Sequence, residues 1–301
     1  MGCPEGAIEA IEYRLRYQAI KEARPVFSGL TVAQLCAIAK VSLSGYYRWN
    51  KTPNTPKQQA DRELQKLIKQ IYDQHNGRYG YRRITMELNR NHHQKIGYKR
   101  VLRLMRKLSL QAIIRRPRQG CTIVRGTNFA PNRLDRNFTA ERPNEKWVTD
   151  VTYLTYGDSQ KAYLSAIKDL YDGTIVAYEV SQRNDNSLVM KNLAQALAQE
   201  PGAHPLLHSD RGTQYTSSQY LRQTTAAGIT ISMSRVGKCI DNAPMESFWS
   251  HYKEEAYYDY KFETYEELVK SIKEYIDFYN HKRYQTKLGS LAPAEYRALA
   301  A

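Results

Sequence analysis

The sequence is 301 residues long, which at ~100–200 residues per domain predicts about two domains and at least one sizeable core. Hydrophobic residues make up 42% and charged residues 25%, and no apolar run approaches the ~18 residues of a membrane span, so we expect no membrane protein. The net charge is +15. The four cysteines are too widely spaced for a zinc site or a disulfide framework, so we expect a protein of the reducing cytoplasm.

The positive charge lies in the first half of the chain. Residues 1–145 carry 28 basic and 11 acidic side chains, whereas residues 146–301 carry 17 and 19. The densest stretch, Arg78 to Arg118, has thirteen basic residues and one acid. A solvated face would explain a short charge run, but this density favours a polyanion whose phosphates release counterions on contact. We therefore expect nucleic acid as a partner.

The first segment, 1–56, is predicted to be helical and to end in a hinge. Residues 31–49 indicate a helix, a turn at Lys40–Val41 and a second helix capped by Ser42. This pattern fits either a small helix-turn-helix or an ordinary helical hairpin. The Thr-Pro-Asn-Thr-Pro stretch at 52–56 breaks the helix and predicts the hinge.

A second helical module is predicted over 57–110 and is the better candidate for reading DNA. Apolar residues at three- and four-residue intervals predict a helix over 59–75, and two further helices begin near Tyr79 and Tyr98. Their basic side chains could contact guanine edges or phosphates, a choice that the sequence leaves open. The candidate DNA contacts are Arg82, Arg83, Lys99, Arg100 and Arg103.

Residues 111–145 mix Arg, Pro, Gly and Asn without periodicity and predict a basic linker. Beyond it, over 146–301, β-branched and aromatic residues predict three antiparallel strands, followed by alternating helices and strands and then two helices. This order predicts an α/β domain with a helix-covered sheet. The expected strands lie near 147–156, 161–170, 174–180, 205–210 and 229–233, and the helices near 187–199, 217–227, 243–257 and 264–281.

Three acidic residues lie where such a sheet can focus charge. Asp150 is inside the first strand, Asp210 follows the buried strand, and Glu246 is in the first turn of the next helix. Ligands gather at the carboxyl ends of strands, and carboxylates held close together need a cation. Hard oxygen ligands select Mg²⁺ or Mn²⁺, and two such ions can support phosphoryl transfer. Asp169 and Asp172 are rival acids that we interpret as turn residues, and Asp241 as an acid near a helix start.

The residues flanking these acids carry a family resemblance. Three segments resemble the DDE integrase core of retroviral integrases and bacterial transposases. They are Trp147-Val-Thr-Asp150-Val-Thr-Tyr, His208-Ser-Asp210-Arg-Gly-Thr-Gln-Tyr and Asp241-Asn-Ala-Pro-Met-Glu246-Ser-Phe-Trp. The resemblance is closest to the OrfB-type insertion-sequence transposases, which share the 35-residue interval between the second and third acids. Three more segments extend this resemblance over nearly the whole chain, namely Leu43-Ser-Gly-Tyr-Tyr-Arg-Trp, Tyr79-Gly-Tyr-Arg-Arg-Ile and Phe278-Tyr-Asn-His-Lys-Arg-Tyr.

This resemblance implies a fold and a site. The fold would be an RNase H-like (retroviral integrase) α/β core with a C-terminal helical extension, preceded by all-α helix-turn-helix modules. Asp150, Asp210 and Glu246 would be the catalytic residues and would ligate two Mg²⁺ (or Mn²⁺) ions. Lys253, seven residues after Glu246, would be the family's basic residue.

The neighbouring polar residues have alternative roles. Seven residues are nearly two helical turns, so Lys253 shares a face with Glu246 and can reach DNA, although it could instead be a solvated charge. Asn242 could cap the helix or touch substrate, and Arg211 is a further candidate DNA contact. His208 and His251 could be second-layer site residues or structural histidines. A zinc site at His75, His92 and His93 is discounted, because no cysteine pair completes it.

The implied activity is that of a DNA transposase catalytic subunit. Water attacks a phosphodiester at the element end, and the freed 3′-hydroxyl attacks a second one, which in OrfB-type relatives produces a circular intermediate. The implied partners are double-stranded DNA, OrfA-derived sequence joined by translational frameshifting, and further copies of this chain on the DNA. We expect it in the bacterial cytoplasm, associated with the nucleoid when bound to DNA. The rival functions are a nuclease or resolvase that cuts without joining, and a non-catalytic DNA-binding regulator.

Overall fold

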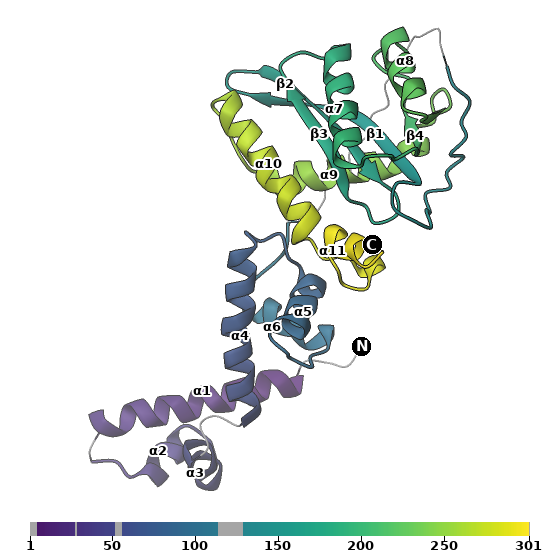
Figure 1. Ribbon diagram of the computed structural model, residues 1–301. Helices are drawn as coiled ribbons and strands as arrows, with labels where there is room; N and C mark the ends of the chain where they lie inside the picture. Colours follow the sequence, from purple (N-terminus) through teal and green to yellow (C-terminus); the bar gives the residue numbers. More distant parts are fainter. Residues whose placement is uncertain (1–4, 28, 52–55, 114–128, 301) are drawn as a thin grey trace. The chain divides into compact units, whose positions relative to one another are not determined.

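A computed structural model describes residues 5–27, 29–51, 56–113 and 129–300 (Figure 1). By its internal contacts the chain divides into two compact units, Met1–Gln70 and Ile71–Ala301. Within the described ranges, no helix combines the length and the apolar character needed to cross a bilayer.

The first unit is helical. It contains α1 (Glu5–Val26), α2 (Val32–Ile38), α3 (Leu43–Lys51) and most of α4 (Pro56–Gln74). Helices α1, α2 and α3 pack on one another around a small core of Ile20, Leu35, Cys36 and Tyr46. The Ser42 hydroxyl accepts a hydrogen bond from the Gly45 amide at 3.1 Å, which confirms the predicted cap of the second helix in this pair.

In the second unit, two short helices precede the sheet. They are α5 (Tyr81–Arg90) and α6 (Tyr98–Lys107), and they pack against each other. Their apolar stripes are buried at Ile84 and Leu88 on α5 and at Val101, Leu104 and Met105 on α6. The predicted helices of this module are confirmed, because apolar residues at three- and four-residue spacing do form one buried face.

The sheet has five strands in the order β3-β2-β1-β4-β5. Strands β1 and β2 and strands β2 and β3 pair antiparallel, whereas β4 runs parallel to both β1 and β5. This order confirms the predicted change from three antiparallel strands to an α/β pattern. The strands are β1 (Lys146–Tyr156), β2 (Gln160–Asp169), β3 (Ile175–Ser181), β4 (Leu206–Ser209) and β5 (Thr230–Met233).

Helices cover the sheet, as Figure 1 shows for α7 and α8. Side chains from α7 and α8 form one core with Trp147, Ile167 and their neighbours on the sheet. Because successive side chains of a strand point to opposite faces, the neighbouring Val148, Asp150 and Lys168 lie on the other face. The helices of this part are α7 (Asn186–Gln199), α8 (Ser218–Ala226), α9 (Ala243–Ala256), α10 (Tyr265–His281) and α11 (Pro293–Ala298), with 3-10 turns at Cys239–Asn242 and Thr286–Leu288.

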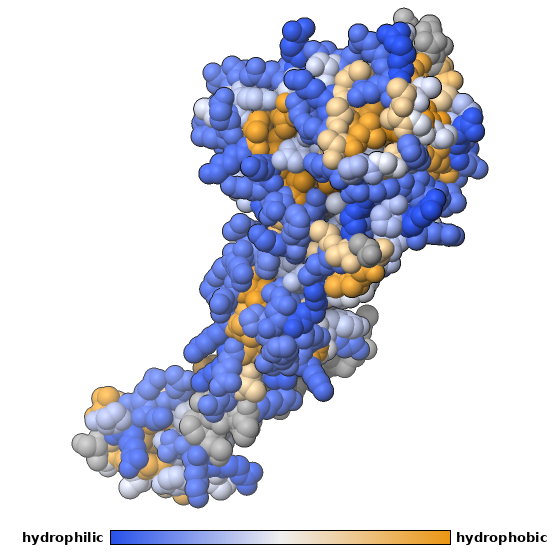
Figure 2. Space-filling model, viewed as in Figure 1, coloured by the Kyte–Doolittle hydropathy of each residue, from blue (hydrophilic) through white to orange (hydrophobic). Residues whose placement is uncertain are grey.

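The turn between β2 and β3 is anchored by a buried ion cluster. The Asp169 carboxylate accepts a hydrogen bond from the Tyr171 amide, and that of Asp172 accepts one from the Thr174 amide. Asp172 is confirmed as a turn residue, whereas Asp169 is the last residue of β2 and holds the turn from the strand end. Arg297 on α11 donates to both acids at 2.9 and 2.8 Å. Helix α11 is therefore attached by charge to the end of β2 and to the turn that follows it. Figure 2 shows that hydrophilic side chains cover most of the visible surface, as expected where the apolar residues form buried cores.

Candidate active site

Asp150 lies in the middle of β1, on the sheet face that α9 covers. Its carboxylate accepts a hydrogen bond from the Trp249 indole Nε1–H at 3.0 Å and one from the Val151 amide at 2.8 Å. The tryptophan comes from α9, so the contact joins the first predicted acid to the helix that carries the third. A half-buried carboxylate held by two donors has a defined orientation.

Asp210 follows β4, the strand that pairs parallel with β1. Its carboxylate accepts a hydrogen bond from the Gly212 amide at 2.8 Å. A Cβ at Gly212 would lie 3.0 Å from the Asp210 Oδ1 and 2.9 Å from the Gln214 Oε1, so a side chain there would crowd the loop. Glycine at this position lets the backbone approach the carboxylate closely.

The three predicted acids influence one another electrostatically. Burial first, and then the negative charges of Asp210 and Glu246, together raise the pKa of Asp150 to about 7. Burial also raises the pKa of Asp210. Glu246 itself is exposed, in the first turn of α9. Side chains that lie 60 and 96 positions from Asp150 in the sequence therefore share one electrostatic environment with it.

The donor chemistry of these acids suits a divalent cation. Carboxylate oxygens are hard ligands of the kind that Mg²⁺ and Mn²⁺ prefer. Burial is the main cause of the raised pKa of Asp150, and the negative charges of Asp210 and Glu246, which a cation would offset, add to it. Over the described ranges, no three His, Cys, Asp or Glu side chains converge closely enough to hold one ion. Carboxylates that repel one another without a cation are expected to stay apart in this way.

The residues beside the acids have defined surroundings. The Asn242 side chain, 5% exposed, donates to the Thr149 carbonyl at 3.1 Å and makes no cap hydrogen bond, although the residue precedes α9. The Lys253 ammonium lies 5.4 Å from the centre of the Tyr153 ring. Arg211 donates to the Ser234 carbonyl at 2.6 Å and stacks over the Phe129 ring.

The candidate DNA contacts of α5 and α6 differ in their exposure and in their surroundings. Lys99 and Arg103 are exposed on α6, and Arg100 is half-buried there. Arg82 donates to the Tyr81 hydroxyl at 3.2 Å. Arg83 is turned into the protein, where it donates to the Tyr284 carbonyl at 3.1 Å and lies 3.7 Å from a Glu255 oxygen.

Two histidines flank the acids in the sequence, and both are buried or half-buried in the fold. The two ring nitrogens of His208 contact the Ser232 and Ser234 hydroxyls at 2.8 and 3.1 Å. The Nδ1 of His251 lies 2.5 Å from the Ser247 carbonyl oxygen. Burial lowers the pKa of each imidazole to about 4, so both rings are neutral at pH 7. The structure thus favours the structural role for both.

Asp241 is a further carboxylate close to the three candidate acids, and its charge is neutralised by two arginines. Its oxygens accept hydrogen bonds from Arg235 at 2.9 Å and from Arg136 at 2.7 Å. The hydrogen bonds from Arg235, followed by those from Arg136, hold its pKa well below the usual value, although burial opposes them. An acid already paired with two arginines is a poor metal ligand, so its role is to fix the loop before α9.

Sequence reasoning missed the basic residues on the other side of α9. Lys168, near the end of β2, is only 8% exposed, and Arg283, beyond α10, forms a buried ion pair with Glu255. The available signal was a lysine at the end of an apolar run, Ala162-Tyr-Leu-Ser-Ala-Ile-Lys168. A charge in such a run requires a polar partner or a ligand.

Comparison with known proteins agrees with this geometry. Residues 140–239 and 246–299 each match a family described as an integrase core domain, and residues 58–118 match an HTH-like domain. The chain is 41% identical over 265 residues to InsK of insertion sequence element IS150 from Escherichia coli K12, covering 88% of this chain and 92% of InsK.

Two further relatives give the same result. The chain is 38% identical to the 31 kDa protein of insertion element IS600 from Shigella sonnei, over 87% of this chain and 97% of that protein. It is 36% identical to the transposase for insertion sequence element IS904 from Lactococcus lactis, over 80% and 96% respectively. The chain therefore belongs to the OrfB-type insertion-sequence transposases of the DDE integrase superfamily, and it is a DNA transposase with an RNase H-like core preceded by an HTH-like DNA-binding domain.

Proposed function

We propose that Asp150, Asp210 and Glu246 are the catalytic carboxylates of this transposase and that they act with divalent metal ions. The observation that carries the proposal is the shared electrostatics of the three side chains, in which burial and then the charges of Asp210 and Glu246 raise the pKa of Asp150. Active sites concentrate such perturbed acids, because the same field that opposes ionisation attracts the cation used in the reaction.

The three carboxylates would hold two Mg²⁺ or Mn²⁺ ions, which when bound polarise the phosphodiester and the attacking oxygen. The protein's own contribution is orientation. Trp249 and the Val151 amide hold the Asp150 carboxylate, and the Gly212 amide holds that of Asp210. Positioned ligands reduce the reorganisation needed in the transition state.

The reaction proposed is cleavage followed by strand transfer. Water hydrolyses a phosphodiester at the element end, and the 3′-hydroxyl released attacks a second phosphodiester. Lys253 lies on the Glu246 face of α9 and beside the Tyr153 ring, and we assign it to the DNA phosphates near the reacting one. Five other basic residues are assigned to contacts with DNA further from the reacting phosphate, namely Arg82, Lys99, Arg100, Arg103 and Arg211. Asn242 is assigned to positioning the loop before α9.

The working complex would contain more than one copy of this chain on paired element ends. The joining of two ends requires two sites of recognition, and a closed symmetric assembly supplies them. OrfA-derived sequence, fused by frameshifting, would supply end recognition and multimerisation. The site of action would be the nucleoid.

The test uses the full chain, Mn²⁺ and labelled pre-cut element ends. We expect joined products from the native protein and none from Asp210→Asn or Glu246→Gln, with DNA binding retained. The matched control is Asp158→Asn, which removes an exposed carboxylate in the turn between β1 and β2. Cleaved but unjoined products from the native protein would indicate a nuclease instead. Joining that survives Asp210→Asn would refute the assignment of the carboxylates.

A further inference from the structure

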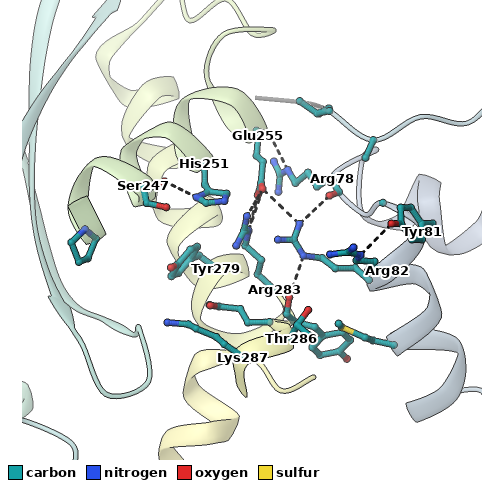
Figure 3. Close-up of a pocket in the computed structure, with 18 of the residues that line it drawn as sticks. Arg78, Tyr81, Arg82, Ser247, His251, Glu255, Tyr279, Arg283, Thr286 and Lys287 are labelled. Carbon is teal, nitrogen blue, oxygen red and sulfur yellow. Dashed lines mark hydrogen bonds and ion pairs between the residues drawn. The ribbon is translucent and has the colours of Figure 1, made fainter. Parts of the chain in front are cut away.

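A cavity of about 620 Å³ lies beside α9, where Ser247, His251 and Glu255 line it (Figure 3). One wall comes from α5 and the turn before it, including Arg78, Tyr81 and Arg82. The other comes from α9, the end of α10 and the turn that follows. The two family-like segments that begin at Tyr79 and Phe278, about 200 residues apart, therefore meet at this cavity.

The cavity is strongly basic. Its lining includes one carboxylate, Glu255, and six cations, namely Arg78, Arg82, Arg83, Lys168, Arg283 and Lys287. Glu255 is already occupied, because Arg283 donates to both of its oxygens at 2.6 to 3.2 Å and Tyr275 donates to it at 3.0 Å. This acid cannot also neutralise the two lysines.

Lys168 and Lys287 are close together and form no ion pair with any described residue. A Cβ placed on Gly173 would lie 3.6 Å from both the Lys168 Cε and the Lys287 Nζ. The Lys168 ammonium has a weak contact of 3.5 Å with the Pro244 carbonyl and lies 5.7 Å from the centre of the Tyr279 ring. Lys168 is buried and Lys287 is exposed, and two like charges this close repel each other unless an anion joins them.

The titration behaviour of the neighbours reflects this uncompensated charge. Burial lowers the pKa of Lys287, and the charge of Lys168 lowers it further. Burial by itself would raise the pKa of Tyr279, but the nearby Lys168 and Arg283 lower it below its usual value. Both effects correspond to a positive field inside the cavity.

We propose that this cavity binds a phosphate group of the DNA strand, with Lys168 and Lys287 as the direct ligands. The volume lies within the range of ligand sites, ~300–1,000 Å³, and leaves room for the attached sugar and base beside Tyr81 and Tyr284. Aromatic rings next to cations suit a nucleotide, because bases stack on rings while phosphates bind the charges. The proposal rests on the transposase function but not on the assignment of the catalytic carboxylates.

Helix α9 separates this cavity from the proposed active site. At 100° per residue, Glu246 and Lys253 fall on one face of the helix, whereas Ser247, His251 and Glu255 fall on the other and line the cavity. A helix with its side chains is ~10–12 Å across, so one DNA strand could be held on both sides of α9 within a few nucleotides. The cavity would then fix the strand relative to the reacting phosphodiester.

The test measures binding of a 5′-phosphorylated thymidine dinucleotide by calorimetric titration at constant ionic strength, with inorganic pyrophosphate as the second probe. We expect the full-length native protein to bind the dinucleotide, and Lys168→Met and Lys287→Met each to weaken binding at least tenfold. The control Lys273→Met removes an exposed lysine on α10 and should bind as the native protein does. Asp210→Asn should also retain binding, which separates this proposal from the carboxylate assignment.

A thermal melt without ligand distinguishes a binding role from a structural one. Because each methionine variant removes one of two repelling charges, its melting temperature should equal or exceed that of the native protein. A fall in melting temperature with unchanged dinucleotide affinity would mean that the lysines are structural and would overturn the proposal. Binding of pyrophosphate without binding of the dinucleotide would overturn the assignment to a DNA strand.

Discussion

The buried ion pair between Glu255 and Arg283 gives the sharpest stability prediction. Glu255 is 6% exposed and Arg283 4%, and their contacts measure 2.6, 3.0 and 3.2 Å. Removing one partner of such a pair leaves a buried charge uncompensated, at a cost of about 3–5 kcal/mol. We therefore expect Glu255→Gln to lower the free energy of unfolding by roughly that amount, or the melting temperature by roughly 6–20 °C at 2–4 °C per kcal/mol.

The assay is urea unfolding at pH 7, followed by circular dichroism, with thermal melts in parallel. The matched control is Glu263→Gln, the same substitution at the exposed pair formed with Lys261 at 2.8 Å, where we expect no measurable change. Arg283→Met should be destabilising as well, and the double variant should lose less than the sum of the two single losses. A Glu255→Gln variant as stable as the Glu263→Gln control would refute the reasoning from burial.

The same pair predicts a pH dependence. Burial by itself would raise the pKa of Glu255, but the charge and hydrogen bonds of Arg283 outweigh it and lower the folded-state pKa below the usual 4.5. The stabilisation is therefore complete above about pH 4.5 and is lost as the pH falls through the folded-state value. The difference in stability between the native protein and Glu255→Gln should shrink over that acidic range, and a difference that grows on acidification would contradict the assigned sign.

Three further predictions concern other buried charges and a buried histidine. Asp241→Asn should cost about 1.5–3 kcal/mol in urea unfolding, because the buried carboxylate loses its charge-assisted hydrogen bonds, while the two partly exposed arginines regain water; a cost under ~0.5 kcal/mol would contradict this. His208 has a folded-state pKa of about 4 against a usual 6.5, so the native protein should lose up to about 3 kcal/mol as the pH falls from 6.5 to 4. His208→Gln should flatten that slope, and an unchanged slope would assign it to other groups. Arg297→Met should cost about 3–5 kcal/mol at pH 7 and less at pH 3, because burial raises the pKa of its partner Asp169 above the usual value, so that this carboxyl is protonated there; an equal cost at both pH values would argue against an electrostatic origin.

Most helices and strands of this protein could be predicted because their signals are local. Alternating and β-branched residues between 147 and 180 predict three strands, and Gly157-Asp158 and Asp172-Gly173 supply the turns that make them antiparallel. Apolar spacing of three and four residues predicts α4 and α7 to α10 to within a few residues. These patterns depend only on neighbours in the chain.

The candidate site could be predicted in part. The residues around Asp150, Asp210 and Glu246 carry a family resemblance that composition and spacing by themselves do not supply. How the three acids influence one another depends on β1 lying beside β4 and on Trp249 of α9 reaching Asp150. Such contacts join residues up to 99 positions apart, and no local pattern specifies them.

The sequence by itself thus determined the α/β order, the basic first half and the identities of the acids, because each is a property of composition, local periodicity or motif. Only the tertiary structure decided which charges are neutralised. Lys168 and Lys287 look like ordinary lysines in the sequence, but in the fold they share a cavity whose single acid, Glu255, is already paired with Arg283. The physical reason is that the energy of a charge depends on its burial and on its neighbours in space, which the fold brings together from distant segments.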